Sequence, residues 1–63
     1  MKGTIKFYNS SKSFGFIKVQ GLKDVFFHKT SLARDYVPED NDNVEFELRQ
    51  TERGPSAENV VKD

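Results

Sequence analysis

Two short aromatic segments carry the side chains in this sequence that are best suited to chemistry. They are Lys12–Val19 (KSFGFIKV) and Asp24–His28 (DVFFH). Successive side chains of a β-strand point to opposite faces, so two neighbouring strands of this kind would share one face of rings and charges. This face would carry Phe14, Phe16, Lys18, Asp24, Phe26 and His28. Flat rings beside cations can stack on the bases of a single-stranded nucleic acid, while the cations contact its phosphates.

The same alternation assigns the remaining apolar residues of the two segments to a core. Ile17 and Val19 lie on the opposite face of the first segment, and Val25 and Phe27 lie on the opposite face of the second. The alternative is that all the phenylalanines are core residues of a two-sided sheet. The aliphatic residues already fill a core side, so we predict that the other rings form an exposed patch, and such a patch indicates a partner.

Charge is segregated along the chain, although the net charge is zero. Residues 1–34 hold seven Lys or Arg and one Asp, whereas residues 35–63 hold three Lys or Arg and nine Asp or Glu. This asymmetry indicates a polyanion partner for the first half, against the alternative of ordinary solvated side chains. The candidate phosphate contacts are Lys6, Lys12, Lys29 and Arg53. Asp24 is a candidate acceptor for base amino groups, or alternatively a turn cap.

Composition excludes several classes of function. The chain has 63 residues, which predicts one domain over residues 1–63, and it has no cysteine and one histidine. We therefore expect no metal site, no cofactor and no catalytic site, because no nucleophile, acid–base pair or ligand cluster is apparent. His28 is a candidate to stack on a base or donate to one, or else a surface residue without a role. No apolar run is long enough to span a membrane and no signal peptide is apparent, so we expect a cytoplasmic protein.

Strand patterns recur along the whole chain, and no long amphipathic helix is predicted. The predicted strands cover residues 3–9, 14–19, 25–28, 43–49 and 57–62, with a single helical turn at residues 30–32. Five short strands avoid exposed edges by closing into a barrel. We predict an all-β fold, a five-stranded antiparallel Greek-key barrel of the OB-fold type, which binds oligonucleotides on its second and third strands.

Four separated motifs resemble those of the bacterial cold-shock proteins, which consist of a single cold-shock domain. Residues 12–17 (KSFGFI) are similar to the first ribonucleoprotein motif of the family, and residues 25–28 (VFFH) are similar to its second. Residues 3–9 resemble its first strand, and residues 53–60 resemble its closing hairpin. The order and spacing match over nearly the full length of the chain.

The sequence departs from the family pattern at several positions. Ser13 stands where glycine is usual, and Phe7 replaces the usual tryptophan. Simple alternation puts Phe7 in the core, whereas the resemblance puts it on the binding face, which requires a bulge in the strand. Lys29 stands where an aromatic residue is usual, and Tyr36 is the candidate aromatic residue of a shortened loop over residues 29–43.

The resemblance implies a protein that binds single-stranded RNA or DNA, with a pyrimidine preference, and acts as an RNA chaperone or regulator in transcription or translation. The rival hypothesis is a module that binds peptides through an aromatic groove. A monomer is expected rather than a strand-exchanged dimer. The candidate nucleic-acid-binding residues are Lys6, Phe7, Lys12, Phe14, Phe16, Asp24, Phe26, His28, Lys29, Tyr36 and Arg53.

Overall fold

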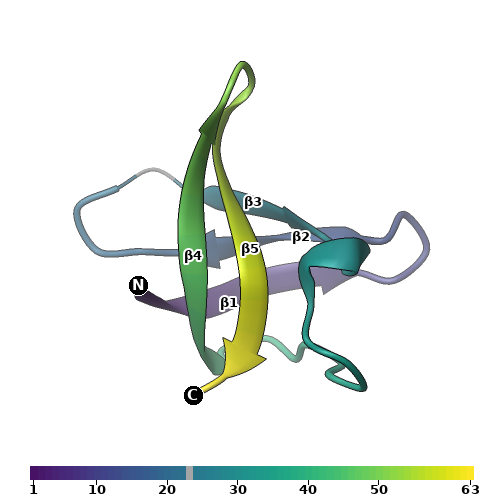
Figure 1. Cartoon of the computed structure of the whole chain (residues 1–63). Coiled ribbons are helices and arrows are strands. Elements are labelled where there is room, and N and C mark those ends of the chain that lie inside the picture. The colour runs from purple at the N-terminus through teal and green to yellow at the C-terminus, as the bar shows by residue number, and fades with distance from the viewer. Residues whose placement is uncertain (23) are drawn as a thin grey trace.

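Five strands and one short 3-10 turn make up the computed structural model, which describes residues 1–22 and 24–63 (Figure 1). Lys23, a member of the basic first half, lies outside the described residues. The elements are β1 (Lys2–Asn9), β2 (Phe14–Lys18), β3 (Val25–His28), η1 (Lys29–Ser31), β4 (Asn43–Thr51) and β5 (Gly54–Lys62). The predicted elements are confirmed, and β4 and β5 extend further into their shared hairpin than the sequence pattern indicated.

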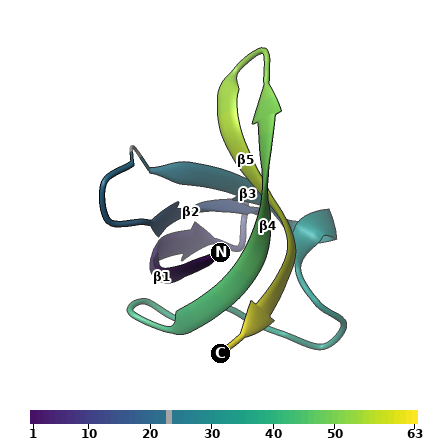
Figure 2. The same cartoon turned by 60° about the vertical axis from the view of Figure 1, so that its left-hand side comes forward.

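The strands close into a barrel in the order β1-β2-β3-β5-β4, with β1 also pairing with β4. Figures 1 and 2 show the β4–β5 hairpin running across the other strands and projecting beyond them. Four pairs are antiparallel, and β3 pairs with β5 in parallel at Phe26 and Ser56. The predicted barrel is therefore confirmed, but it is mixed rather than purely antiparallel. A closed ring with an odd number of strands cannot alternate direction throughout, so one pair must be parallel.

The barrel interior is filled by aliphatic residues and two phenylalanines. Its buried members are Ile5, Ile17, Val19, Val25, Phe27, Val44, Phe46, Ala57 and Val60. The four residues that alternation assigned to the core side of the two aromatic segments are all among them. Gly15 faces the same interior, and a Cβ atom there would lie 2.7 Å from Cζ of Phe27. Glycine at position 15 therefore makes room for the largest buried side chain.

A bulge in β1 changes which face its residues occupy. The pairing with β2 shifts between Ile5, opposite Ile17, and Phe7, opposite Phe16. Two consecutive residues, Lys6 and Phe7, are therefore both exposed, and Tyr8 returns to the interior. The bulge that the family resemblance required is confirmed, whereas simple alternation would have buried Phe7.

The loop between η1 and β4 is hydrogen-bonded to β1 shortly before β4 begins. The backbone N–H of Asn41 donates to the carbonyl of Ile5, and the N–H of Ile5 donates to the carbonyl of Asp42, both at 2.8 Å. The Tyr36 hydroxyl donates to Oδ2 of Asp42 at 2.8 Å, and the same oxygen accepts the N–H of Glu39 at 3.1 Å. These bonds lower the pKa of Asp42, and burial together with that carboxylate raises the pKa of Tyr36.

Ser13 adopts a left-handed backbone conformation, with φ of 62°, in the turn between β1 and β2. An L-residue in this conformation is strained by roughly 1–2 kcal/mol, and glycine is not. We expect Ser13→Gly to raise the free energy of unfolding by about 1 kcal/mol, after the larger entropy of glycine in the unfolded chain offsets part of the gain. Denaturant melts of the two proteins measure this difference. An unchanged or lower stability would show that the turn holds serine without strain.

The bonds to Asp42 predict a dependence of stability on acid. The pKa of Asp42 is lowered in the folded state, chiefly by the hydrogen bond from Tyr36, so the folded state binds the proton less readily than the unfolded chain. The stabilisation is therefore complete above the ordinary aspartate pKa of 3.8 and is lost as the pH falls below it. We expect the stability difference between the parent and Tyr36→Phe to shrink from about pH 7 to about pH 2. Melts at both values measure it, and a constant difference would contradict this assignment.

Candidate nucleic-acid interface

Four phenylalanine rings from three strands form one cluster on the outer face of the barrel. The centroids of Phe14 and Phe16 are 6.1 Å apart, and both rings lie within 6 Å of Phe26, at 5.9 and 5.8 Å. Phe7 joins from β1, with its centroid 5.5 Å from that of Phe16. We call these four residues the ring cluster. All four of these contacts are tilted or edge-on. Phe7 and Phe26 are exposed, and Phe14 and Phe16 are partly buried.

The register of β2 and β3 explains why these rings gather outside. Phe16 lies opposite Phe26, and Phe14 lies opposite His28, while the intervening pair of Gly15 and Phe27 faces the interior. Phe7 and Phe26 are each 38% exposed, although both are large apolar residues. Phe27 is 0% exposed, as the alternation predicted.

Basic side chains surround the ring cluster, and the structure places them in two different situations. Nζ of Lys6 lies 2.6 Å from Oδ2 of Asp24, so these two candidate residues neutralise each other in the free protein. Among the described residues, Lys12, Lys29 and Arg53 have no carboxylate within 4 Å of their charged groups. Asp24 thus faces a cation from β1 in the free protein.

The turn between β1 and β2 is held against the start of η1. The backbone N–H of Lys29 donates to the carbonyl of Ser13 at 2.8 Å, and the N–H of Lys12 donates to Oδ1 of Asn9 at 3.1 Å. Two exposed lysines are thereby placed at the end of the face where His28 and Phe14 lie. Position 29, where the family resemblance predicts an aromatic residue, therefore presents a cation.

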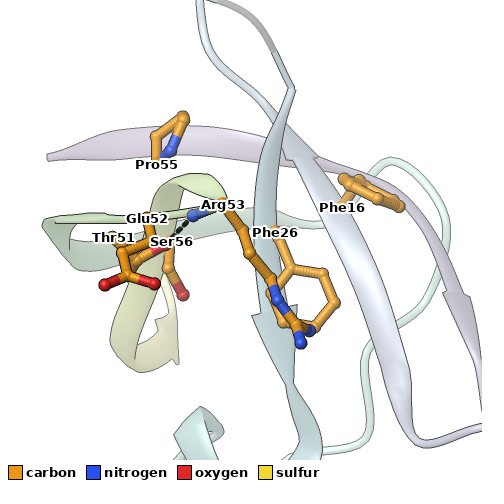
Figure 3. Close-up of a pocket in the computed structure, with 7 residues that line it drawn as sticks. All are labelled: Phe16, Phe26, Thr51, Glu52, Arg53, Pro55 and Ser56. Carbon is orange, nitrogen blue, oxygen red and sulfur yellow. Dashed lines mark hydrogen bonds between the residues drawn. The ribbon is translucent and has the colours of Figure 1, made fainter.

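A groove of about 620 Å³ continues the ring cluster toward the β4–β5 turn. Figure 3 shows the Arg53 side chain extending from this turn toward the ring of Phe26, with Phe16 farther along the same groove. The remaining lining residues are Thr51, Glu52, Pro55 and Ser56. Sequence reasoning missed Pro55 and Ser56, because the parallel pairing of Phe26 with Ser56 joins segments 30 residues apart. The only available signal was the Arg-Gly-Pro run within residues 53–60, which resemble the closing hairpin of the family.

Tyr36 is the one candidate residue that the structure does not bring to this face. Its ring packs against the barrel core, and its hydroxyl donates to Asp42 inside the loop before β4. The loop is fastened to β1 through Ile5, which turns Tyr36 inward rather than toward the ring cluster. Tyr36 is therefore not part of the ring cluster, and its assignment to the nucleic-acid face stays a prediction.

Among residues 1–22 and 24–63, no three His, Cys, Asp or Glu side chains are grouped closely enough to hold a metal ion. No helix in the described part of the chain is long and apolar enough to cross a membrane.

A small closed barrel with an aromatic outer face on β2 and β3 is the architecture of oligonucleotide-binding domains. The family model for the 'Cold-shock' DNA-binding domain matches residues 1–63, so this chain belongs to the cold-shock domain family, whose members generally bind nucleic acids. The chain is 46% identical over 63 residues to "Cold shock protein CspA" of Staphylococcus haemolyticus (strain JCSC1435), which covers 97% of the chain and 96% of that relative. It is 44% identical over 63 residues to the protein of the same name from Staphylococcus saprophyticus, with the same coverage.

The fold is also similar to a solved structure, drosophila Unr CSD456. The TM-score is 0.80 at 28% sequence identity, and the match covers 98% of this chain. The chain spans 26% of that longer chain. The likeness therefore concerns one barrel within a larger protein.

The two faces of β3 predict opposite effects for two neighbouring substitutions. Phe26→Ala should weaken single-strand binding by about 1–3 kcal/mol, the value of one stacked base, and leave stability largely unchanged. Phe27→Ala should lower the free energy of unfolding by about 3–5 kcal/mol, because it empties a packed core position. Thermal melts and oligonucleotide titrations of both variants measure these effects. If Phe27→Ala melted like the parent and lost binding, the assignment of the faces would be inverted.

Proposed function

We propose that this protein binds single-stranded RNA or DNA by stacking unpaired bases on the ring cluster and holding phosphates with the surrounding basic side chains. The single observation that carries the proposal is the set of four neighbouring phenylalanine rings on β1, β2 and β3. Solvated faces of barrels do not ordinarily gather four such rings. Base stacking on aromatic rings contributes about 1–3 kcal/mol per base and tolerates different sequences.

Within this proposal the rings bind the bases, and three cations act at the edges. Lys12 and Lys29 contact phosphates at one end of the face, and Arg53 contacts the strand from the groove at the other end. Lys6 exchanges its bond with Asp24 for a bond to a phosphate, which frees the carboxylate to accept a base amino group. Tyr36 is left out, because its ring supports the core.

Stacking also determines which nucleic acids are bound. The bases of a duplex are already stacked on one another, so their faces are not accessible to the rings. The protein would hold RNA in its unpaired form, and we propose that it acts in the cytoplasm as a monomeric RNA chaperone or regulator of transcription or translation. We further propose a preference for pyrimidine-rich strands, because smaller bases unstack from their neighbours with less cost.

A peptide-binding module is the second candidate, and the groove beside Phe26 is the observation that favours it. The groove is lined mainly by two rings and the β4–β5 turn, and small barrels bind extended peptides in such grooves. The ring cluster extends beyond this groove to Phe7 and Phe14, on a face bordered by cations. That extension and those charges fit a polyanion with repeated flat groups better than a peptide.

Fluorescence anisotropy titrations test the proposal with labelled oligo-dT, oligo-dA and a duplex of the same length. We expect oligo-dT to bind most tightly and the duplex to bind at least tenfold more weakly. Single-strand affinity falls with a log–log salt slope of about −0.7 per phosphate neutralised, so two to four phosphate contacts predict a slope of roughly −1.4 to −2.8.

The same titrations contain the outcomes that would contradict the proposal. A duplex bound as tightly as the single strand would exclude stacking as the source of affinity. A much steeper salt slope would show that charge dominates. Capture of a protein from a nuclease-treated lysate, without any binding of oligonucleotides, would favour the peptide-binding alternative.

A further inference from the structure

His28 makes two contacts that have no direct part in nucleic-acid binding. It is the last residue of β3 and also the N-cap of η1. Its Nδ1 atom lies 3.2 Å from the backbone nitrogen of Thr30 and 3.1 Å from the Thr30 hydroxyl oxygen. The Nδ1 side of the imidazole ring is therefore hydrogen-bonded to Thr30, while the His28 side chain as a whole remains exposed.

These contacts determine which ring nitrogen carries the proton. A backbone N–H can only donate, so Nδ1 must accept with its lone pair. In the neutral imidazole the proton then sits on Nε2, and the Thr30 hydroxyl is free to donate to Nδ1 as well. The ring presents a hydrogen-bond donor at its outer end and keeps its acceptor turned toward η1.

We propose that Thr30 is a positioning residue that fixes His28 as an Nε2–H donor on the nucleic-acid face. The ligand atom that His28 takes is consequently an acceptor of the strand, which is a base carbonyl, a base ring nitrogen or a phosphate oxygen, and not an exocyclic amino group. This inference rests on the proposed function for its ligand, but the tautomer follows from the contacts in the free protein alone.

The location of His28 on the face supports this role. Its β3 position lies opposite Phe14 of the ring cluster, so a base stacked there would bring its own oxygens near the imidazole. The carbonyl of Ser13 accepts the N–H of Lys29 at 2.8 Å, which places η1 and the turn before β2 side by side. At this end of the face, the uncharged Nε2–H group of His28 can donate a hydrogen bond beside Lys12 and Lys29 without adding positive charge.

Nuclear magnetic resonance tests the tautomer in the absence of any ligand. At about pH 8, where ordinary imidazole side chains are uncharged, ¹⁵N shifts distinguish the protonated ring nitrogen from the unprotonated one. We expect Nε2 to carry the proton in the parent and in Thr30→Ser. Thr30→Val keeps the backbone donor but loses the hydroxyl, so Nε2–H should remain the main form with a smaller excess than in the parent. A parent ring protonated mainly on Nδ1 would overturn the proposal.

Titrations with oligo-dT connect the tautomer to binding. Thr30→Val should lower affinity by about threefold to tenfold, which corresponds to one neutral hydrogen bond, and Thr30→Ser should restore it. As a control, Thr30→Val is also introduced into the His28→Asn variant. Asparagine is a favourable N-cap and retains an acceptor for η1, but it lacks the imidazole ring. In this background Thr30→Val should change affinity by less than twofold.

The outcomes separate the proposal from its alternatives. An equal loss of affinity in both backgrounds would show that Thr30 acts without His28, which would contradict a positioning role. If the coupling appears only on oligo-dT, the acceptor is a thymine carbonyl, and if it persists on oligo-dA, which has no base carbonyl oxygen, the acceptor is a phosphate oxygen or an adenine ring nitrogen. Failure of the parent to bind any single strand would refute the proposed function, and the ¹⁵N result would still decide the tautomer.

Discussion

The packing of Phe27 beneath Gly15 is the constraint on which the binding face depends. These residues lie opposite each other in the β2–β3 pair, and a side chain at position 15 would collide with the buried ring and with the carbonyl of Phe7. The contact fixes the register of the two strands, because a slip of one residue would turn every side chain to the other face. With this register in place, the rings on either side of Gly15 can only point outward. Tyr8 stacks on Phe27 from β1 at 5.8 Å and so links the third strand of the face to the same core ring.

Much of the fold and of the face was predictable from residues 12–28, for a physical reason. Alternation within a strand and a tight connection between neighbouring strands are local properties, and they determine the faces of Phe14, Phe16, Phe26 and Phe27. The bulge at Lys6 and Phe7 required the family resemblance, because a bulge breaks the period from which alternation is inferred. The pairing of strands that are distant in the chain could not be inferred from the sequence. The β3–β5 pair and the inward orientation of Tyr36 arise from barrel closure and from loop hydrogen bonds.

The distribution of charge complements this arrangement. Several acidic residues of the second half lie on the exposed side of β4 and β5, where Glu58 pairs with Arg49 and Glu47 accepts a hydrogen bond from Asn59. The unpaired cations named above surround the ring cluster instead. Charge is therefore distributed unevenly over the barrel, although the net charge is zero.

The ring cluster is also organised before any ligand arrives. Each exposed ring contacts at least one other ring, and the edge-on contacts of Phe16 with Phe14 and Phe26 restrict how far these rings can rotate. In the proposed complex, less side-chain freedom would be lost when a base stacks, so more of the stacking energy would appear as affinity. Phe7 contributes at the edge of this arrangement, where it offers a smaller surface than an indole. The hydroxyl and backbone of Thr30 restrain His28 in the same way at the other end. The face is thus a set of mutually restrained side chains on a short, register-locked strand pair and the neighbouring β1, which explains how a domain of 63 residues can hold two exposed and two partly buried phenylalanines in fixed positions.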